Sequence, residues 1–219
     1  MTNLKHTIPI AATLCAFLLF SCSTVERDNP YDKGGINYGG GGKSGYRTVP
    51  IGTQVWMAEN LNYNVSGSLC YENKESNCKK YGRLYDWATA MELPSNCNSE
   101  SCTSLISEKH RGICPDGWHI PSEAEWTILI DYLGDKETAG KYLKTSDWNG
   151  NDEYGFSALP GGQGYRNDNG GSFSGIGGYG NWQSSSGSFC ASMSYYYDYL
   201  YLWCNLTKSS SISVRCLQD

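Results

Sequence analysis

The chain has 219 residues, of which 39% are hydrophobic and 13% aromatic. This length and composition suit one domain with a buried core, accompanied by a shorter appendage. The formal net charge is −5, and no run of lysine and arginine interrupts the sequence. Nucleic acid and anionic membrane surfaces are therefore excluded as expected partners.

Residues 1–21 have the features of a signal peptide. A short positive region at Lys5 precedes the apolar run 8–20, which is too short to span a bilayer as a helix. The run leads into Leu19-Phe20-Ser21-Cys22, which resembles the lipobox of bacterial lipoproteins. We expect cleavage before Cys22 and lipidation of Cys22. An ordinary signal peptide that is cleaved at the same place without lipidation is the alternative.

Residues 22–45 are expected to form a lipidated N-terminus and a flexible, glycine-rich tether, because the segment around Gly39–Ser44 cannot hold a defined backbone without a partner. Its Gly-Lys-Ser end imitates a phosphate-binding loop, but Asn37 stands where that motif needs glycine. The globular domain then occupies residues 46–219. Through its lipid the chain would be an outer-membrane lipoprotein of the cell envelope, facing the periplasm or the cell surface.

Eight of the ten cysteines lie in the expected domain, and an even number in an exported chain predicts disulfides. No pair has the C-x2-C spacing of a zinc site, and no histidine lies at a suitable distance along the chain. The spacing of the cysteines favours two disulfides that close short loops and a third that spans an aromatic segment. The two remaining cysteines would form a long-range pair. The four expected pairs are Cys70–Cys78, Cys97–Cys102, Cys190–Cys204 and Cys114–Cys216.

The first half of the domain begins with two short apolar runs within Val49–Met57, which predict a hairpin turning at Gly52-Thr53. Over residues 81–91, apolar side chains recur at i, i+3, i+4 and i+7, which predicts a helix that ends before Pro94. The recurring residues are Leu84, Trp87, Ala88 and Met91.

A second helix is predicted after a short strand at Trp118. Ser122 and Glu125 have the spacing of a capping box, and Gly134 marks the end of the helix. Its buried stripe comprises Trp126, Leu129, Ile130 and Leu133. A short third helix is expected over Thr138–Leu143. Beyond Gly155, brief apolar runs indicate a small, irregular antiparallel sheet with long loops. These runs are Phe156–Leu159, Asn181–Ser184 and Ser211–Leu217.

Five blocks in this order resemble the Fibrobacter succinogenes major paralogous domain over about residues 46–219. The blocks are Ile51–Tyr63, Tyr81–Ala90, Cys114–Trp126, Gly155–Gly162 and Ser213–Cys216. The resemblance implies a bacterial domain, commonly carried on exported proteins and lipoproteins, with no established activity. It also implies an α+β, C-type-lectin-like fold. In that fold two main helices pack beside a small twisted antiparallel sheet with long disulfide-braced loops. The chain ends would lie close together, which a Cys114–Cys216 bridge would suit.

An enzymatic role would follow from a second resemblance. Gly117–Trp126 and Val214–Cys216 are similar to blocks of formylglycine-generating, sulfatase-modifying enzymes, which oxidise a substrate cysteine with a copper-binding cysteine pair. The even cysteine count favours disulfides over such a pair, and no H-E-x-x-H or G-x-S-x-G motif is present. We interpret His119 as a packed, hydrogen-bonded residue, and Glu125 as part of a helix start. We therefore expect no enzymatic activity, and a formylglycine-generating-type oxidoreductase is kept as a weaker alternative.

Calcium-dependent sugar binding in C-type lectins uses Glu-Pro-Asn or Gln-Pro-Asp together with Trp-Asn-Asp on the following strand. Neither proline motif is present, and Trp148-Asn-Gly-Asn-Asp152 lies well before the late strands. No cofactor is therefore expected. Calcium bound by the loops Asn149–Asp152 or Arg166–Asn169 is kept as a weaker alternative.

An aromatic segment between Cys190 and Cys204 is the strongest candidate for ligand contact. Strand periodicity places five aromatic side chains on one face, with Leu200, Leu202 and Cys204 buried on the other. The five are Tyr195, Tyr197, Tyr199, Tyr201 and Trp203. Aromatic faces stack on sugar rings, which predicts a cell-surface module that binds polysaccharide or another envelope protein. The alternatives are an aromatic ladder that only stabilises the sheet, and a structural envelope protein.

Overall fold

The computed structural model describes residues 45–167, 171–187 and 189–219. The expected signal peptide, the lipidation site Cys22 and almost all of the tether lie outside the described residues, and so do residues 168 and 169 of the Arg166–Asn169 loop. Among the described residues, the search for a helix long and apolar enough to cross a membrane finds none.

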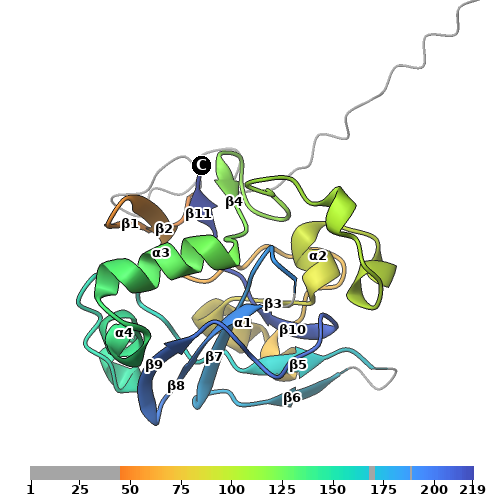
Figure 1. The fold of residues 1–219 in the computed structure, drawn as a ribbon. Helices are drawn as coiled ribbons and strands as arrows, with labels where there is room; N and C mark the ends of the chain where they lie inside the picture. Colours follow the sequence, from red (N-terminus) through yellow and green to blue (C-terminus); the bar gives the residue numbers. More distant parts are fainter. Residues whose placement is uncertain (1–44, 168–170, 188) are drawn as a thin grey trace, which may run out of the picture.

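A four-stranded antiparallel sheet joins the two ends of the domain (Figure 1). The last strand lies between the N-terminal hairpin and β4, which places the chain ends side by side. In spatial order its strands are β1 (Thr48–Ile51), β2 (Gln54–Met57), β11 (Leu217–Gln218) and β4 (Trp118–His119). The predicted hairpin and the strand at Trp118 are therefore confirmed.

A second, seven-stranded sheet carries the C-terminal half of the domain. Its main path runs through β6 (Ser172–Ser174), β5 (Gln163–Tyr165), β10 (Ser210–Ser213), β7 (Tyr179–Gln183), β8 (Cys190–Ser194) and β9 (Tyr197–Tyr201). Strand β3 (Leu84–Tyr85) pairs with β10 off this path. The expectation of one small antiparallel sheet is therefore wrong in number, because the described residues form two sheets, and wrong in direction only for β10 and β7, which pair in parallel.

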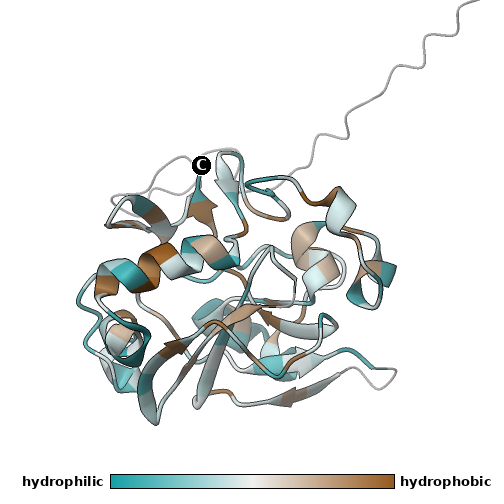
Figure 2. Ribbon diagram, viewed as in Figure 1, coloured by the Kyte–Doolittle hydropathy of each residue, from teal (hydrophilic) through white to brown (hydrophobic). Residues whose placement is uncertain are grey.

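Helix α3 (Glu123–Leu133) forms as the sequence predicts. The Ser122 hydroxyl accepts a hydrogen bond from the Glu125 amide at 3.3 Å, and the Glu125 carboxylate accepts one from the Ser122 amide at 2.8 Å. Figure 2 shows hydrophobic and hydrophilic residues alternating along this helix, and all four residues of the predicted stripe are buried. Helix α4 (Lys136–Leu143) follows, capped by Asp135, and confirms the short third helix.

The helix predicted over residues 81–91 is wrong. Helix α1 (Glu75–Tyr81) ends at Gly82, whose φ of 78° is a backbone conformation that glycine adopts without strain. The chain then forms β3, and helix α2 covers only Trp87–Met91, starting at the Asp86 cap. The four apolar side chains are buried as their spacing predicts, but Leu84 is buried from strand β3 and the other three from the short helix α2. Helix α1 itself was not predicted.

Phe156–Leu159 is also not a strand; only an isolated bridge joins Ala158 to Lys144. The remaining short helical turns are all 3-10 helices. They are η1 (Tyr71–Asn73), η2 (Ser95–Asn98), η3 (Thr103–Leu105) and η4 (Ser146–Trp148).

Helix α3 lies between the two sheets and fills the larger core cluster (Figure 1). Its Trp126 ring packs 4.6 Å from that of Trp56 in the four-stranded sheet. Leu129 and Ile130 belong to the same cluster as Met193 and Leu200 of the second sheet. Because buried aromatic rings contribute large apolar areas, the packing of α3 against both sheets holds the two sheets together as one unit.

The described cysteines form the four disulfides expected from their spacing: Cys70–Cys78, Cys97–Cys102, Cys114–Cys216 and Cys190–Cys204. The long-range bridge connects the segment before β4 to the residue before β11, beside the meeting point of the chain ends. The domain is therefore a mixed α+β, disulfide-braced fold.

Candidate functional site

The predicted aromatic segment forms the second strand of the β8–β9 hairpin. Tyr197, Tyr199 and Tyr201 alternate along β9, while Leu200 points to the opposite side and is fully buried. Tyr197 is 60% exposed, Tyr201 is exposed, and Tyr199 is half-buried. The central part of the predicted aromatic face is therefore turned to solvent.

The ends of the predicted strand are wrong. Tyr195 lies with Tyr196 in the turn between β8 and β9, and Trp203 lies two residues beyond the end of β9. Both are exposed, but neither belongs to the strand face. Leu202 and Cys204 are half-buried rather than buried. Strand periodicity failed here because the hairpin register, which the local pattern does not contain, ends the strand at Tyr201.

Ring geometry separates the strand tyrosines from Trp203. The rings of Tyr197 and Tyr199 lie 6.1 Å apart, and those of Tyr199 and Tyr201 lie 5.1 Å apart, tilted by 44° and 37°. These rings lean on one another along the strand. None of the ring contacts found within the described ranges involves Trp203, which is 66% exposed. Trp203 therefore offers an open, flat platform, and the three tyrosines form a ladder beside it.

Helix α4 holds the β8–β9 hairpin in place. Strand β9 is an edge strand, and a Cβ atom built on Gly140 of α4 would lie 2.5 Å from the Tyr199 carbonyl oxygen. Only glycine allows the helix to come this close. At the end of α4 the buried Lys144 ammonium donates hydrogen bonds to the carbonyls of Ser194 and Tyr197, at 2.9 and 2.8 Å. Burial lowers the pKa of Lys144, against the opposing effect of Asp198 3.7 Å away.

Two hollows flank Trp203 on the described surface. We call the first the acidic hollow; it has a volume of about 540 Å³ and lies between α3, the start of α4 and the end of β9. Its rim carries Asp131, Asp135, Lys136 and Glu137. We call the second the amide hollow; it has a volume of about 390 Å³ and is lined by Gln163, Asn181 and Asn205 with serine hydroxyls. Both volumes fall within the range of small-molecule sites.

His119, the histidine that could pass for a catalytic residue, is fully enclosed. Its Nδ1 lies 2.7 Å from a carboxylate oxygen of Asp219, and its Nε2 lies 2.8 Å from one of Glu125. Burial would lower the pKa of His119, but the hydrogen bonds and charges of the two carboxylates outweigh it and raise the pKa. Burial likewise opposes the effect of His119 and Ser122 on Glu125, whose pKa falls to about 2.

An arginine that the sequence did not single out as functional is also buried. Arg215 donates hydrogen bonds to the side-chain oxygen of Asn60 and to the carbonyls of Phe156 and Ser157. Its guanidinium carbon lies 4.1 Å from the centre of the Phe156 ring. Burial lowers the pKa of Arg215 to about 9, so the group stays charged at neutral pH. Buried groups of the protein accept the hydrogen bonds of the Arg215 guanidinium, so we interpret Arg215 as a structural cation.

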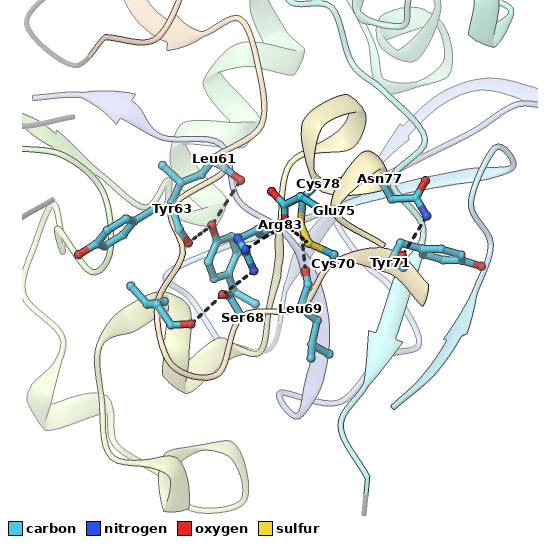
Figure 3. Close-up of a disulfide and its surroundings, with 12 residues drawn as sticks. Leu61, Tyr63, Ser68, Leu69, Cys70, Tyr71, Glu75, Asn77, Cys78 and Arg83 are labelled. Atoms are coloured by element: carbon cyan, nitrogen blue, oxygen red, sulfur yellow. Dashed lines mark hydrogen bonds and ion pairs between the residues drawn. A yellow bond between two sulfur atoms is a disulfide. The ribbon is translucent and has the colours of Figure 1, made fainter. Parts of the chain in front are cut away.

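Side chains that could hold a metal ion come close together at one place in the described part of the chain. The one group of three histidine, cysteine, aspartate or glutamate residues found among the described residues is Cys70, Glu75 and Cys78, shown in Figure 3. Its sulfur atoms are joined in a disulfide, so neither can bind a metal as a thiolate. Glu75 instead lies 3.5 Å from the guanidinium of Arg83.

The Asn149–Asp152 loop, a weaker calcium alternative, uses its carboxylate internally. The Asp152 oxygens accept hydrogen bonds from the amide and the hydroxyl of Ser157, at 2.6 and 2.7 Å. Asn149 donates to the Tyr195 carbonyl at 3.0 Å and so supports the β8–β9 turn. This loop braces the hairpin that carries the aromatic residues.

Residues 49–218 match the Fibrobacter succinogenes major domain, which covers well over half of the chain. The chain belongs to this family. No curated protein sequence and no solved structure matches it significantly. Four of the five blocks that carry the family resemblance meet in the interior, where Arg215 donates hydrogen bonds to Asn60 and to the Phe156 carbonyl, and Asn60 donates one to the Tyr81 carbonyl. These four residues of the blocks therefore belong to the interior of the fold, whereas the exposed aromatic residues of the β8–β9 region lie outside the blocks.

Proposed function

We propose that this member of the family is a non-catalytic binding module that contacts a glycan through Trp203 and the tyrosine ladder. The observation that carries the proposal is the exposure of Tyr197 on the hairpin and of Trp203 just beyond it, in a segment held by α4 and by the Cys190–Cys204 disulfide. Exposed aromatic rings on a rigid support contribute much contact area at little cost in conformational entropy. A structural role alone would favour burying them.

Support for a non-catalytic role comes from the groups that chemistry would need. All eight cysteines in the described part of the domain are in disulfides, so a copper-binding thiol pair would first require reduction. His119 itself is buried, and both of its ring nitrogens are held by carboxylates. We also propose that the fold is C-type-lectin-like, on the basis of the paired chain ends and the helices beside the sheets.

We further propose that the chain is an outer-membrane lipoprotein anchored at Cys22. The lipobox-like sequence supports this location, and a tether of about twenty residues would hold the domain clear of the membrane surface. Metabolic labelling with a radioactive fatty acid tests it. Wild-type chain should incorporate the label and Cys22→Ala should not; unchanged membrane partitioning of Cys22→Ala would contradict the proposal.

Binding itself is tested with a glycan array and with pull-down on insoluble polysaccharides. The combined variant Tyr197→Ala, Tyr199→Ala and Trp203→Ala should lose the retention shown by the wild type. Tyr132→Ala is the matched control, because Tyr132 is a 54% exposed aromatic on α3 that packs near the Gly52 turn instead. Equal retention of the triple variant and the control would remove the aromatic residues from the binding site. Absence of retention by the wild type would favour a structural role.

A further inference from the structure

Trp203 separates two hollows of different chemical character. It lines both of them, so a ligand lying across its ring would enter the acidic hollow at one end and the amide hollow at the other. Leu202 lines only the first hollow and Cys204 only the second, so the chain itself forms the ridge. An elongated ligand therefore fits this surface better than a compact one.

The amide hollow is neutral and rich in hydrogen-bonding groups. None of the described residues that line it is charged, and its polar groups are amides and hydroxyls. The buried Asn181 has its oxygen fixed by a 2.7 Å hydrogen bond from Ser192, and its amide nitrogen lies 3.4 Å from the Gln163 oxygen. Such fixed amides suit the hydroxyl groups of uncharged sugars, because both can donate and accept hydrogen bonds.

The acidic hollow carries net negative charge. Asp131, Asp135 and Glu137 place three carboxylates on its rim against the single ammonium of Lys136. Asp135 also caps α4 by accepting hydrogen bonds from the Thr138 amide and hydroxyl, both at 2.8 Å. Tyr201 and Trp203 line the same hollow. A cation in this hollow would gain both from the carboxylates and from the negative faces of the rings.

We propose, on the basis of the glycan-binding function above, that the ligand is a linear glycan containing amino sugars. It stacks on Trp203, places a protonated amino sugar in the acidic hollow and uncharged sugar rings in the amide hollow. Charge complementarity decides between the sugar classes. Glycans built of uronic acids or sulfated sugars would bring like charge to the three carboxylates and are disfavoured.

The test compares two glucosamine oligomers of equal length, one with free amines and one fully N-acetylated. Isothermal titration of the full chain is carried out at mildly acidic pH, where the free amines are protonated. We expect the cationic oligomer to bind more tightly and to weaken as salt is added, because salt screens exposed charges. The N-acetylated oligomer should show little salt dependence.

Three variants locate the subsites. Asp131→Asn with Glu137→Gln should weaken binding of the cationic oligomer about tenfold and leave the N-acetylated oligomer unchanged. Trp203→Ala should weaken both by roughly thirtyfold, as expected for a central aromatic contact. Asn205→Ala should weaken both several-fold, and Tyr132→Ala should change neither. All of these residues lie on the surface, and a thermal melt confirms that each variant is folded.

The outcomes separate this inference from the function on which it rests. Equal binding of the two oligomers, or an affinity that the double carboxylate variant leaves intact, would overturn the amino-sugar assignment. Retention of other glycans with loss on Trp203→Ala would then still uphold the binding function. A wild-type chain that retains no glycan at all would overturn both.

Discussion

The side-chain oxygen of Asn60 accepts two hydrogen bonds from Arg215, at 2.8 Å from Nη2 and 3.2 Å from Nε. The same oxygen accepts a third from the indole nitrogen of Trp182 at 2.8 Å. A neutral amide thus takes the place that a carboxylate would usually have beside a buried guanidinium. One side chain from the first family block thereby connects the last block to the second sheet.

Replacement of Asn60 tests how much these hydrogen bonds contribute to the stability of the domain. Asn60→Ala leaves the buried guanidinium and the Trp182 indole without their shared acceptor, and we expect a loss of about 3 kcal/mol in the free energy of unfolding. Urea denaturation measures it. Asn62→Ala is the matched control, because the Asn62 side-chain oxygen is buried without a hydrogen-bond partner in the described structure. Equal losses in the two variants would contradict the proposed importance of the junction.

The His119 cluster predicts how stability depends on pH. Glu125 has a pKa of about 2 in the folded chain, against an ordinary pKa of 4.5. Its contribution to the free energy of unfolding is therefore complete above pH 4.5 and is lost as the pH falls toward 2. The pKa of His119 is raised above 6.5, so its contribution is complete below 6.5 and is lost as the pH rises through the raised value. Both contributions are present together between pH 4.5 and 6.5.

Chemical denaturation from below pH 4.5 to above pH 6.5 gives the measurement, and NMR titration of the His119 ring gives the pKa directly. His119→Gln should flatten the decline of stability above pH 6.5, the ordinary pKa of histidine. His110→Gln is the control, since His110 is only partly buried and bonds to the Met91 carbonyl rather than to a carboxylate. A His119 pKa at or below its ordinary value would refute the arrangement.

Features that depend on neighbouring residues could be predicted from the sequence. The capping box of α3 needs only Ser122 and Glu125 three residues later, and its buried stripe follows from helix period. Cys70–Cys78 and Cys97–Cys102 close short loops that leave few competing partners. The aromatic alternation of β9 likewise follows from strand period alone.

Features that depend on distant pairing could not be predicted. Leu84 continues the apolar period of α2, yet it pairs with Ser213 in β10 and becomes a strand residue. One of the two carboxylate partners of His119, Asp219, lies one hundred residues further along the chain. The residues next to Lys144 and Arg215 in the sequence do not indicate that these two side chains are buried. The groups that accept their hydrogen bonds are mostly backbone carbonyls of other elements. The hollows beside Trp203 arise in the same way, from segments that meet only in the fold.

Lys144 is predicted to stabilise the binding hairpin. Lys144→Met removes the donor for the Ser194 and Tyr197 carbonyls, and we expect a loss of about 2 kcal/mol because buried acceptors are left unpaired. Amide hydrogen exchange in β9 should accelerate more than in the four-stranded sheet. Lys141→Met on the exposed side of α4 is the control. Uniform acceleration across the domain would show that Lys144 supports the whole fold and has no particular effect on the hairpin.

The Cys190–Cys204 disulfide is predicted to hold Trp203 in place for glycan binding in addition to stabilising the domain. It closes a segment of 14 residues that contains the tyrosine ladder and ends next to Trp203. Replacing both cysteines by serine should cost about 3 kcal/mol by the loop-entropy model and, by freeing Trp203, weaken glycan binding about tenfold. The same double replacement at Cys70 and Cys78 is the matched control, because that bridge closes a loop of 8 residues whose cysteines do not line the two hollows. Equal affinity in the two folded double variants would show that the bridge does not preorganise Trp203.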